Sequence, residues 1–161
     1  MKTCVYLSYK GLGANLLHLA YCHEIAKKYG PITIITLCSN LGRALKDDPH
    51  IDRVLFISKY HKRFIDILKL KKLLNTFNFD RIFIYYPSLR IFLASVLSNI
   101  KVVHSYPIFK KKNLHLIKAA KTFTERSIGI NNCPTETKFF IKKDKVEKIN
   151  KLFDNKKFKI I

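Results

Sequence analysis

The chain has 161 residues, enough for one domain with a real core, and its 48% apolar and 26% charged residues exclude a disordered composition. No apolar run approaches the roughly 20 residues of a membrane span, and the first eight residues are too short for the apolar region of a signal peptide, so we expect a cytoplasmic protein. Its 31 Lys and Arg against 11 Asp and Glu give a formal net charge of +20, which must attract anionic surfaces at low salt.

The first third of the chain alternates β-rich and helical patterns. Residues 3–8 form a short apolar run that predicts a strand, and Gly11 and Gly13 mark a turn after it. Residues 15–29 repeat apolar side chains at helical spacing and end at Gly30, a helix stop signal. Residues 32–38 are almost continuously apolar and β-branched, as in a strand that is buried on both faces.

The same alternation continues to the end of the sequence. The further elements that we expect are helices at 41–46, 64–77, 89–97, 115–128 and 144–153, and strands at 53–57, 80–86, 100–104, 138–141 and 158–161. Strands that alternate with helices indicate an α/β fold with a parallel sheet covered on both faces, and a Rossmann-like doubly wound sheet is the first choice.

The polar, turn-rich segment 131–137 predicts the end of this domain. We therefore expect a Rossmann-like domain over 1–133. We expect 134–161 to be an inter-domain segment that leads into the first strand of a second α/β domain, absent from this chain.

The turn at Gly11 and Gly13 has two interpretations. Backbone amides of a glycine turn after a first strand can approach a phosphate, but the chain can also make a tight turn there that binds nothing. A dinucleotide fingerprint needs a third glycine, where the sequence has Leu16, and an acid after the second strand, where it has none. NAD binding is therefore disfavoured, and the absence of a Walker A motif excludes a P-loop enzyme.

Basic residues follow three consecutive predicted strands. Lys59, His61, Lys62 and Arg63 follow the third and Arg90 follows the fourth, while residues 110–112 follow the fifth, just after His104 and Tyr106. Carboxyl ends of parallel strands meet at one edge, where such groups could bind phosphates or carboxylates. The alternative is an ordinary solvated face in a lysine-rich chain whose composition reflects an AT-rich genome.

The cysteines and histidines do not form a metal site. Cys4, Cys22, Cys38 and Cys133 include no C-x-x-C pair, and we expect buried free thiols of a reducing compartment. His18 and Cys22 stand at i and i+4, but without a second pair a packed histidine is favoured over a metal ligand.

Several blocks in series resemble glycosyltransferase family 9, the lipopolysaccharide heptosyltransferases. Residues 12–20 (LGANLLHLA) are similar to the family's turn L-G-D-x-L-x-x-x-P, and residues 45–54 (LKDDPHIDRV) to its nP-x-I-D-x-V segment. Residues 79–84 (FDRIFI) resemble its fourth strand, and residues 115–129 its helix that ends in L-G. Order and spacing agree over about residues 3–161.

This resemblance implies the N-terminal half of a GT-B fold, which binds an anionic lipid A–Kdo acceptor at the inner membrane surface of a bacterium. The other half would bind ADP-heptose, without a metal. The acceptor-binding residues expected from the resemblance and the residue patterns together are Gly11, Gly13, Asn15, Lys59, His61, Lys62, Arg63 and Arg90.

Two departures from the family pattern bear on activity. The family's catalytic Asp corresponds to Ala14, and neither it nor the neighbouring Asn15 can act as a general base. The half that binds the nucleotide sugar is also missing. The leading hypothesis is an incomplete glycosyltransferase of lipopolysaccharide or cell-surface glycan synthesis. The alternative is a non-catalytic basic module for an anionic lipid surface or nucleic acid, although no nucleic-acid motif appears.

Overall fold

The computed structural model of the chain describes residues 1–57, 65–86, 88–106, 115–141 and 146–147. Within them a single parallel sheet has the strand order β3-β2-β1-β4-β5. The strands are β1 (Thr3–Leu7), β2 (Ile32–Thr36), β3 (Ile51–Phe56), β4 (Arg81–Ile84) and β5 (Val102–Ser105). The predicted doubly wound sheet is confirmed. Its strand order reverses between β1 and β4, the place where such sheets bind ligands.

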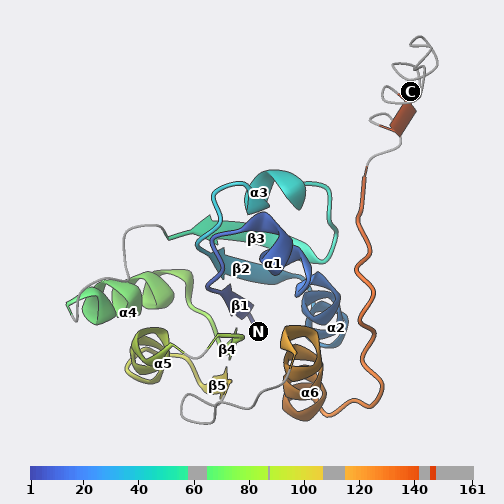
Figure 1. The fold of residues 1–161 in the computed structure, drawn as a ribbon. Helices are drawn as coiled ribbons and strands as arrows, with labels where there is room; N and C mark the ends of the chain where they lie inside the picture. Colours follow the sequence, from blue (N-terminus) through green and yellow to red (C-terminus); the bar gives the residue numbers. More distant parts are fainter. Residues whose placement is uncertain (58–64, 87, 107–114, 142–145, 148–161) are drawn as a thin grey trace.

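Helices cover both faces of the sheet (Figure 1). On one face lie α4 (Asp66–Phe77) and α5 (Leu89–Val96), and on the other lie α2 (Leu19–Tyr29) and α6 (Leu116–Ile128). The short α1 (Leu12–Leu16) follows β1, and α3 (Leu41–Ala44) lies beside β3. Gly30 and Gly129, both with positive φ, end α2 and α6 where the sequence predicts helix stops.

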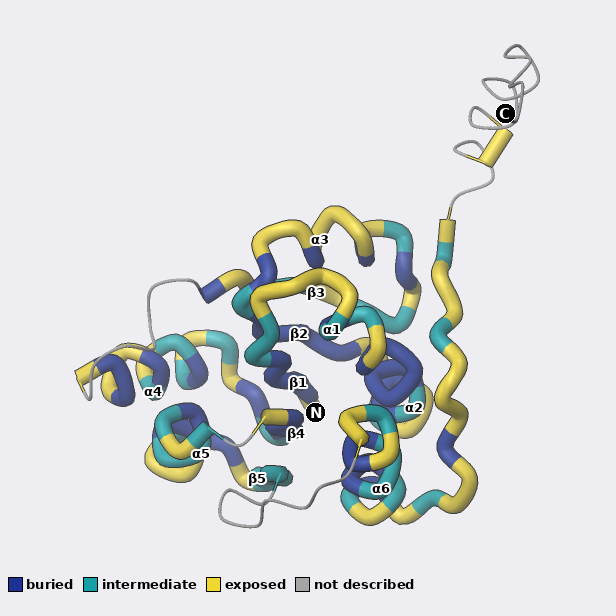
Figure 2. Tube along the Cα trace, viewed as in Figure 1, coloured by how far each residue is buried: buried dark blue, intermediate teal, exposed yellow. Residues whose placement is uncertain are grey.

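The sheet separates two apolar cores. Alternate residues of β1 divide between them: Val5 and Leu7 pack towards α2 and α6, while Cys4 and Tyr6 pack towards α4 and α5. Every residue of β1 and β2 is buried, whereas the edge strands β3 and β5 are largely half-buried or exposed (Figure 2). This burial explains the continuous apolar run over residues 32–38.

The structure corrects two predicted elements. Residues 15–29 do not form one helix, because the chain breaks between α1 and α2 at Leu17 and His18. Residues 138–141 form no strand. The strand predicted at 158–161 and most of the helix predicted at 144–153 lie outside the described residues. All four cysteines are free and buried, as predicted.

Residues 131–141, which we call the strap, run beside α2 and α6 without helix or strand (Figure 1). The amide of Cys133 donates to Glu125 Oε1 at 3.0 Å, and Thr137 Oγ1 donates to the carbonyl oxygen of Leu16 at 3.1 Å. The ring of Phe140 lies edge-on to the rings of His23 and His50 at 5.6 and 5.5 Å. The strap is therefore fixed to the domain at three points.

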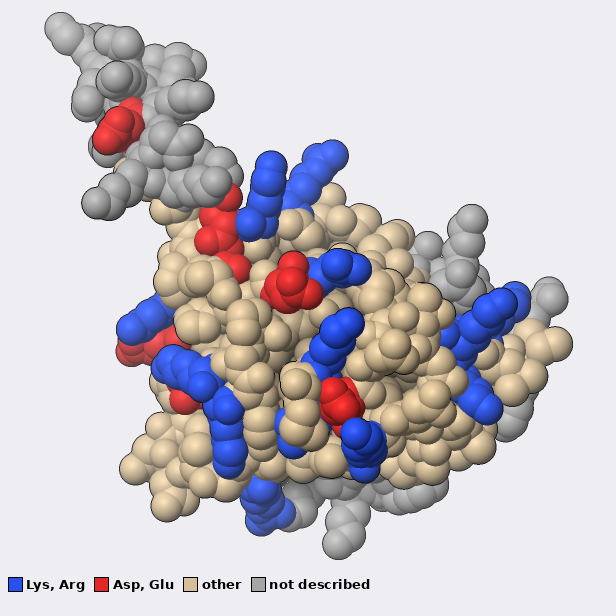
Figure 3. All heavy atoms as spheres, turned by 180° about the vertical axis from the view of Figure 1, so that it is seen from behind, with Lys and Arg blue, Asp and Glu red and all other residues tan. Residues whose placement is uncertain are grey.

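Basic side chains are spread over the face seen from behind, with few acidic ones between them (Figure 3). Such a distribution produces a general positive field in addition to any local cluster. Among the described residues, no helix has the length and apolar character needed to cross a membrane.

Candidate functional site

The turn after β1 is held by Asn15. Its side-chain amide donates to the carbonyl oxygens of Tyr9 at 2.8 Å and Gly11 at 2.7 Å, and its Oδ1 accepts a bond of 2.9 Å from Thr36 Oγ1. Asn15 is buried, so this polar group requires partners, and it finds them in the turn and at the end of β2. The hydrogen bonds of Asn15 thereby fix the path of the chain from β1 into α1.

His18 occupies the break between α1 and α2. Its backbone amide bonds to the carbonyl of Asn15 at 3.0 Å, one residue short of the helical partner Ala14. The carbonyl of Ala14 is taken instead by Nδ1 of His18 at 2.7 Å. Because a carbonyl only accepts, Nδ1 carries the hydrogen in neutral His18 and the lone pair is on Nε2.

Nε2 of His18 is buried and has no hydrogen-bond partner among the described residues. The ring is enclosed by aromatic rings: it stacks on Tyr9 at 4.9 Å between centroids and meets Tyr85 edge-on at 5.3 Å. Burial lowers the pKa of His18, and the bond to Ala14 opposes this only in part. His18 is therefore neutral at pH 7, with an unused acceptor atom.

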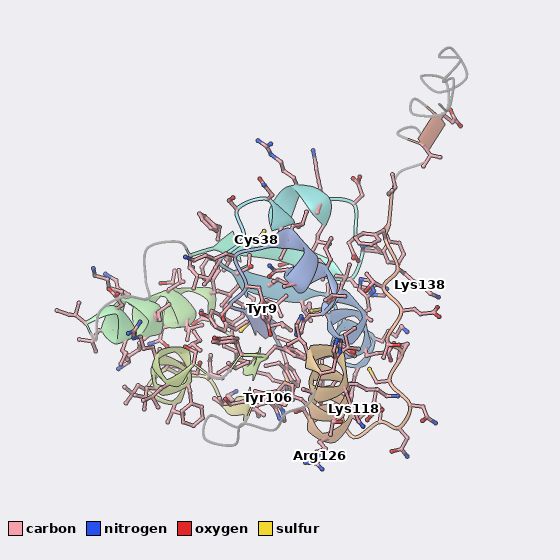
Figure 4. All side chains as sticks on the ribbon, viewed as in Figure 1. Tyr9, Cys38, Tyr106, Lys118, Arg126 and Lys138 are labelled. Carbon is pink, nitrogen blue, oxygen red and sulfur yellow. The ribbon has the colours of Figure 1, made fainter. Side chains whose placement is uncertain are left out.

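A cavity of about 220 Å³ adjoins His18, and we call it the aromatic cavity. Tyr9 comes from the segment after β1, Tyr85 and Tyr86 from the segment after β4, and Tyr106 from the residue after β5 (Tyr9 and Tyr106 are labelled in Figure 4). The start of α6 supplies the remaining wall through Leu116, Ala119 and Ala120. The cavity thus lies at the carboxyl edge of the sheet, beside the β1–β4 switch point.

The described lining of the aromatic cavity contains no charged group at neutral pH. Burial, reinforced by neighbouring Tyr86 and Tyr106, raises the pKa of Tyr9 to about 12, and burial also raises the pKa of Tyr106. The floor is deeply buried, with His18 at 1% and Tyr85 at 3% exposure, whereas Tyr86 at the rim is 44% exposed. The described part of the lining is therefore neutral, and the cavity opens to solvent.

Arg90 lies in a different hollow, on the α4 and α5 face of the sheet. Ile67, Ser88, Leu89 and Leu93 line this hollow of about 330 Å³ with it. Burial raises the pKa of Tyr6 in β1 to about 12, and the charge of Arg90 opposes this rise. Arg90 is thus within electrostatic reach of the same sheet edge.

The structure brings together some of the predicted site residues. Gly11, Gly13 and Asn15 lie in the turn after β1 and in α1, and Arg90 lies at the start of α5. A methyl group added at Gly11 or Gly13 would meet no atom within 4 Å, so both glycines leave open space. Lys59, His61, Lys62, Arg63 and residues 110–112 lie outside the described residues, and the acceptor-binding roles stay predictions.

Cys22 belongs to the core of the domain, and His104 is half-buried on the edge strand β5. His104 stacks on Phe83 at 4.6 Å, and burial, with the nearby charge of Arg81, lowers its pKa. Burial raises the pKa of Cys22, which disfavours the thiolate that a metal needs. Within the part of the chain that the structure describes, no three His, Cys, Asp or Glu residues are grouped as metal ligands.

Sequence reasoning missed the aromatic cavity, although a signal for it was present. Tyr9 and Tyr106 stand one and two residues after predicted strands, and Tyr85 and Tyr86 are the last two residues of the strand predicted at 80–86, close to the placement that identified the basic clusters. The break between α1 and α2 at Leu17 and His18 has no signal in the sequence, because neither Gly nor Pro stands there.

The chain matches no protein-family model, and it has no match among curated protein sequences. Its fold is similar to that of a glycosyl transferase family 9 structure from Veillonella parvula, with a TM-score of 0.67 and 16% identity over 98% of this chain and 50% of that one. Escherichia coli ADP-heptose LPS heptosyltransferase II has a TM-score of 0.63 and 11% identity, over 98% of this chain and 52% of that one. Escherichia coli heptosyltransferase WaaC with ADP-2-deoxy-2-fluoro heptose has a TM-score of 0.52 and 12% identity, over 85% of this chain and 51% of that one.

The chain spans about half the length of each of these structures. The five-strand parallel sheet with helices on both faces, together with its similarity to these structures, confirms the expected Rossmann-like half of a GT-B architecture. The chain therefore has the fold of one half of the glycosyltransferase family 9 and heptosyltransferase structures.

Proposed function

We propose that this chain is the acceptor-binding, N-terminal half of a heptosyltransferase-like glycosyltransferase of lipopolysaccharide or cell-surface glycan synthesis. The observation that supports it most is the similarity of 98% of the chain to half of a family 9 structure. In the complete enzyme, a hydroxyl of an anionic glycolipid would attack the anomeric carbon of a nucleotide sugar, which the other half would hold.

The acceptor's phosphates or carboxylates would be bound at the carboxyl edge of the sheet. Arg90 is the second residue of α5, which follows β4 at this edge, and Lys62 and Arg63 belong to the segment that follows β3. Guanidinium and ammonium groups bind such anions through charge-assisted hydrogen bonds. The general positive field would also draw the protein to the anionic inner membrane surface, giving peripheral contact.

Vesicle binding tests this proposal. The full chain is mixed with phosphatidylcholine vesicles that contain either Kdo-bearing lipid A or phosphatidylglycerol at equal surface charge. We expect tighter binding to the lipid A vesicles at about 0.15 M salt, where the Debye length is about 8 Å and nonspecific attraction is weak.

A pair of variants separates specific binding from total charge. K62A/R63A/R90A should lose the preference for lipid A vesicles. K2A/K72A/R126A removes the same charge from exposed positions away from the carboxyl edge and should keep the preference. Equal binding to both vesicle types, or equal loss in both variants, would contradict an acceptor-binding role and favour a nonspecific basic module.

A further inference from the structure

Helix α5 is apolar on its outer side as well as on its inner side. The inner side packs into the core through Ile91 and Ala94, which are both buried. At about 100° per residue, the outer side is an arc of about 140°. It contains only apolar residues, which we call the α5 face: Leu89, Phe92, Leu93, Val96 and the C-cap residue Leu97. A helix that is apolar all round is normally covered all round.

The described part of the chain does not cover the α5 face. Leu89, Val96 and Leu97 are 45%, 54% and 53% exposed, and Phe92 and Leu93 are half-buried. Figure 2 shows exposed residues on the outer side of this helix. Single apolar side chains at a surface need no explanation, but a contiguous group of them marks a site of interaction.

The exposed charges next to the α5 face are positive. Lys69 and Lys72 are exposed on α4, which packs beside α5. Asp66 is the only acidic residue of these two helices, and it is buried. Whatever covers the α5 face must therefore be apolar where it meets the leucines and negatively charged where it meets the lysines.

A protein partner does not meet these requirements. A second copy of this chain brings a formal net charge of +20 of its own and would be repelled. A helix of eight residues is also only about 12 Å long and about 10 Å wide, a footprint of roughly 120 Å², whereas a stable interface buries about 800 Å² per partner. A bilayer requires no such minimum area, because each inserted side chain adds to the binding and anionic lipids supply the negative charge.

The hollow at the start of α5 is also suited to a lipid. Its volume is about 330 Å³, and its lining consists of Ile67, Ser88, Leu89, Arg90 and Leu93. Leu89 and Leu93 belong to the α5 face, so the hollow adjoins it. Its apolar side chains and its guanidinium group match the acyl chain and the phosphate of a phospholipid.

We propose that the α5 face inserts into the interfacial layer of an anionic bilayer, about 5–10 Å deep, while the lysines of α4 contact lipid phosphates. This insertion goes beyond the proposed function, which uses only the general positive field and the anionic groups of the acceptor. It would give the protein a fixed orientation. The strap, which runs beside α2 and α6 on the other face of the sheet, would point away from the bilayer (Figure 1).

Tryptophan fluorescence of the full chain tests the insertion. The chain contains no tryptophan, so a single introduced one reports its own surroundings. V96W places it on the α5 face, and T135W, at an exposed position of the strap, is the control. Both are mixed at about 0.15 M salt with vesicles of phosphatidylcholine and phosphatidylglycerol that contain no lipid A. We expect the emission of V96W to shift to shorter wavelength and to be quenched by lipids brominated on the acyl chains, and T135W to show neither change.

Two double variants separate apolar contact from charge, since neither alters a charged residue. V96S/L97S should weaken binding to the same vesicles about tenfold in cosedimentation. F139S/I141S is the matched control, because Phe139 and Ile141 in the strap are 52% and 58% exposed, and it should bind as the original chain does. Circular dichroism reports whether each variant is folded, and the quenching of V96W decides if V96S/L97S is not.

Several results would overturn the insertion. V96W could remain unquenched, or could emit at short wavelength without vesicles because another part of the chain covers α5. The two double variants could bind equally, which would leave charge as the only attraction. V96S/L97S could convert a dimer into a monomer in sedimentation equilibrium, which would assign the α5 face to a second copy.

The outcome is separate from that of the lipid A assay. Quenching of V96W without a lipid A preference would refute the proposed function and leave the insertion standing. A lipid A preference without quenching of V96W would refute only the insertion.

Discussion

At position 13 a glycine occupies the second residue of α1, where alanine is the better helix former by about 1 kcal/mol. Neither its backbone angle nor its surroundings require glycine, because an added methyl group meets nothing within 4 Å. The open space in front of the turn is a feature that a bound ligand could use.

We predict that G13A raises the free energy of unfolding by about 0.5–1 kcal/mol, because it favours helix and narrows the unfolded ensemble. Urea denaturation measures the change. G30A is the matched control: Gly30 has a φ of +86°, which strains any L residue, so the same substitution there should lower stability by about 1 kcal/mol. A destabilised G13A would show that position 13 needs glycine for the fold itself.

His18 and His104 predict a pH dependence of stability. Burial lowers the pKa of both in the folded chain, so the unfolded chain binds protons more readily. Stability is then fully present above the unfolded pKa of about 6.5 and falls as the pH drops below it. Folded H18F should lose less stability than the wild type between pH 8 and 5.5 in urea titrations, and parallel losses would contradict the prediction.

At the scale of elements, burial on both faces made the strands predictable, and the glycine stops at 30 and 129 made two helix ends predictable. The break between α1 and α2 was not predictable, because it depends on a tertiary contact. The side chain of Asn15 donates to the carbonyl of Tyr9 in the turn and accepts from Thr36 in β2. Periodicity alone continues the helix through such a point.

In the strap, the sequence predicts a strand that the structure does not contain. Residues 138–141 have strand-like composition, but they pair with no sheet edge, and Phe140 instead meets the rings of His23 and His50. His23 is itself held by Asp48, with 2.7 Å between Nε2 and Oδ2 in a buried pair. The side chain of Phe140 therefore contributes more to this segment than backbone pairing does.

We predict that F140A lowers the free energy of unfolding by about 1 kcal/mol, in line with the 0.5–1.5 kcal/mol of aromatic contacts. F139A is the matched control, since Phe139 is 52% exposed and its loss should change stability by less than about 0.5 kcal/mol. Urea denaturation of both variants decides the matter, and equal effects would mean that the strap is not anchored through Phe140.

For the whole molecule, a charge of +20 predicts that salt stabilises the fold. With 31 basic and 11 acidic residues, most cations cannot have an acidic partner, and their mutual repulsion weakens as the Debye length falls from about 10 Å at 0.1 M to about 3 Å at 1 M. The melting temperature should rise with sodium chloride over this range. A flat or falling profile would show that the positive side chains are too far apart to repel one another.

The arrangement of the whole molecule determines which parts of the site the sequence could predict. Strand ends are visible in the sequence and the parallel order brings them to one edge, so the turn at Gly11 and Gly13 and the location of Arg90 could be anticipated. Which side chains line a cavity depends on packing between distant elements. Tyr9 and Tyr106, nearly a hundred positions apart, line one cavity only because β4 lies between β1 and β5.

The burial of every cysteine makes the chain suitable for site-directed thiol labelling. Cys4, Cys22, Cys38 and Cys133 are at most 4% exposed, and burial raises the pKa of Cys133 to about 11. Maleimides react with accessible thiolates, so the folded chain should react with them very slowly. A cysteine introduced at exposed Lys118 on α6 (Figure 4), as K118C, would then be the single reactive thiol, and a fluorophore could be attached near the aromatic cavity without removing a native cysteine.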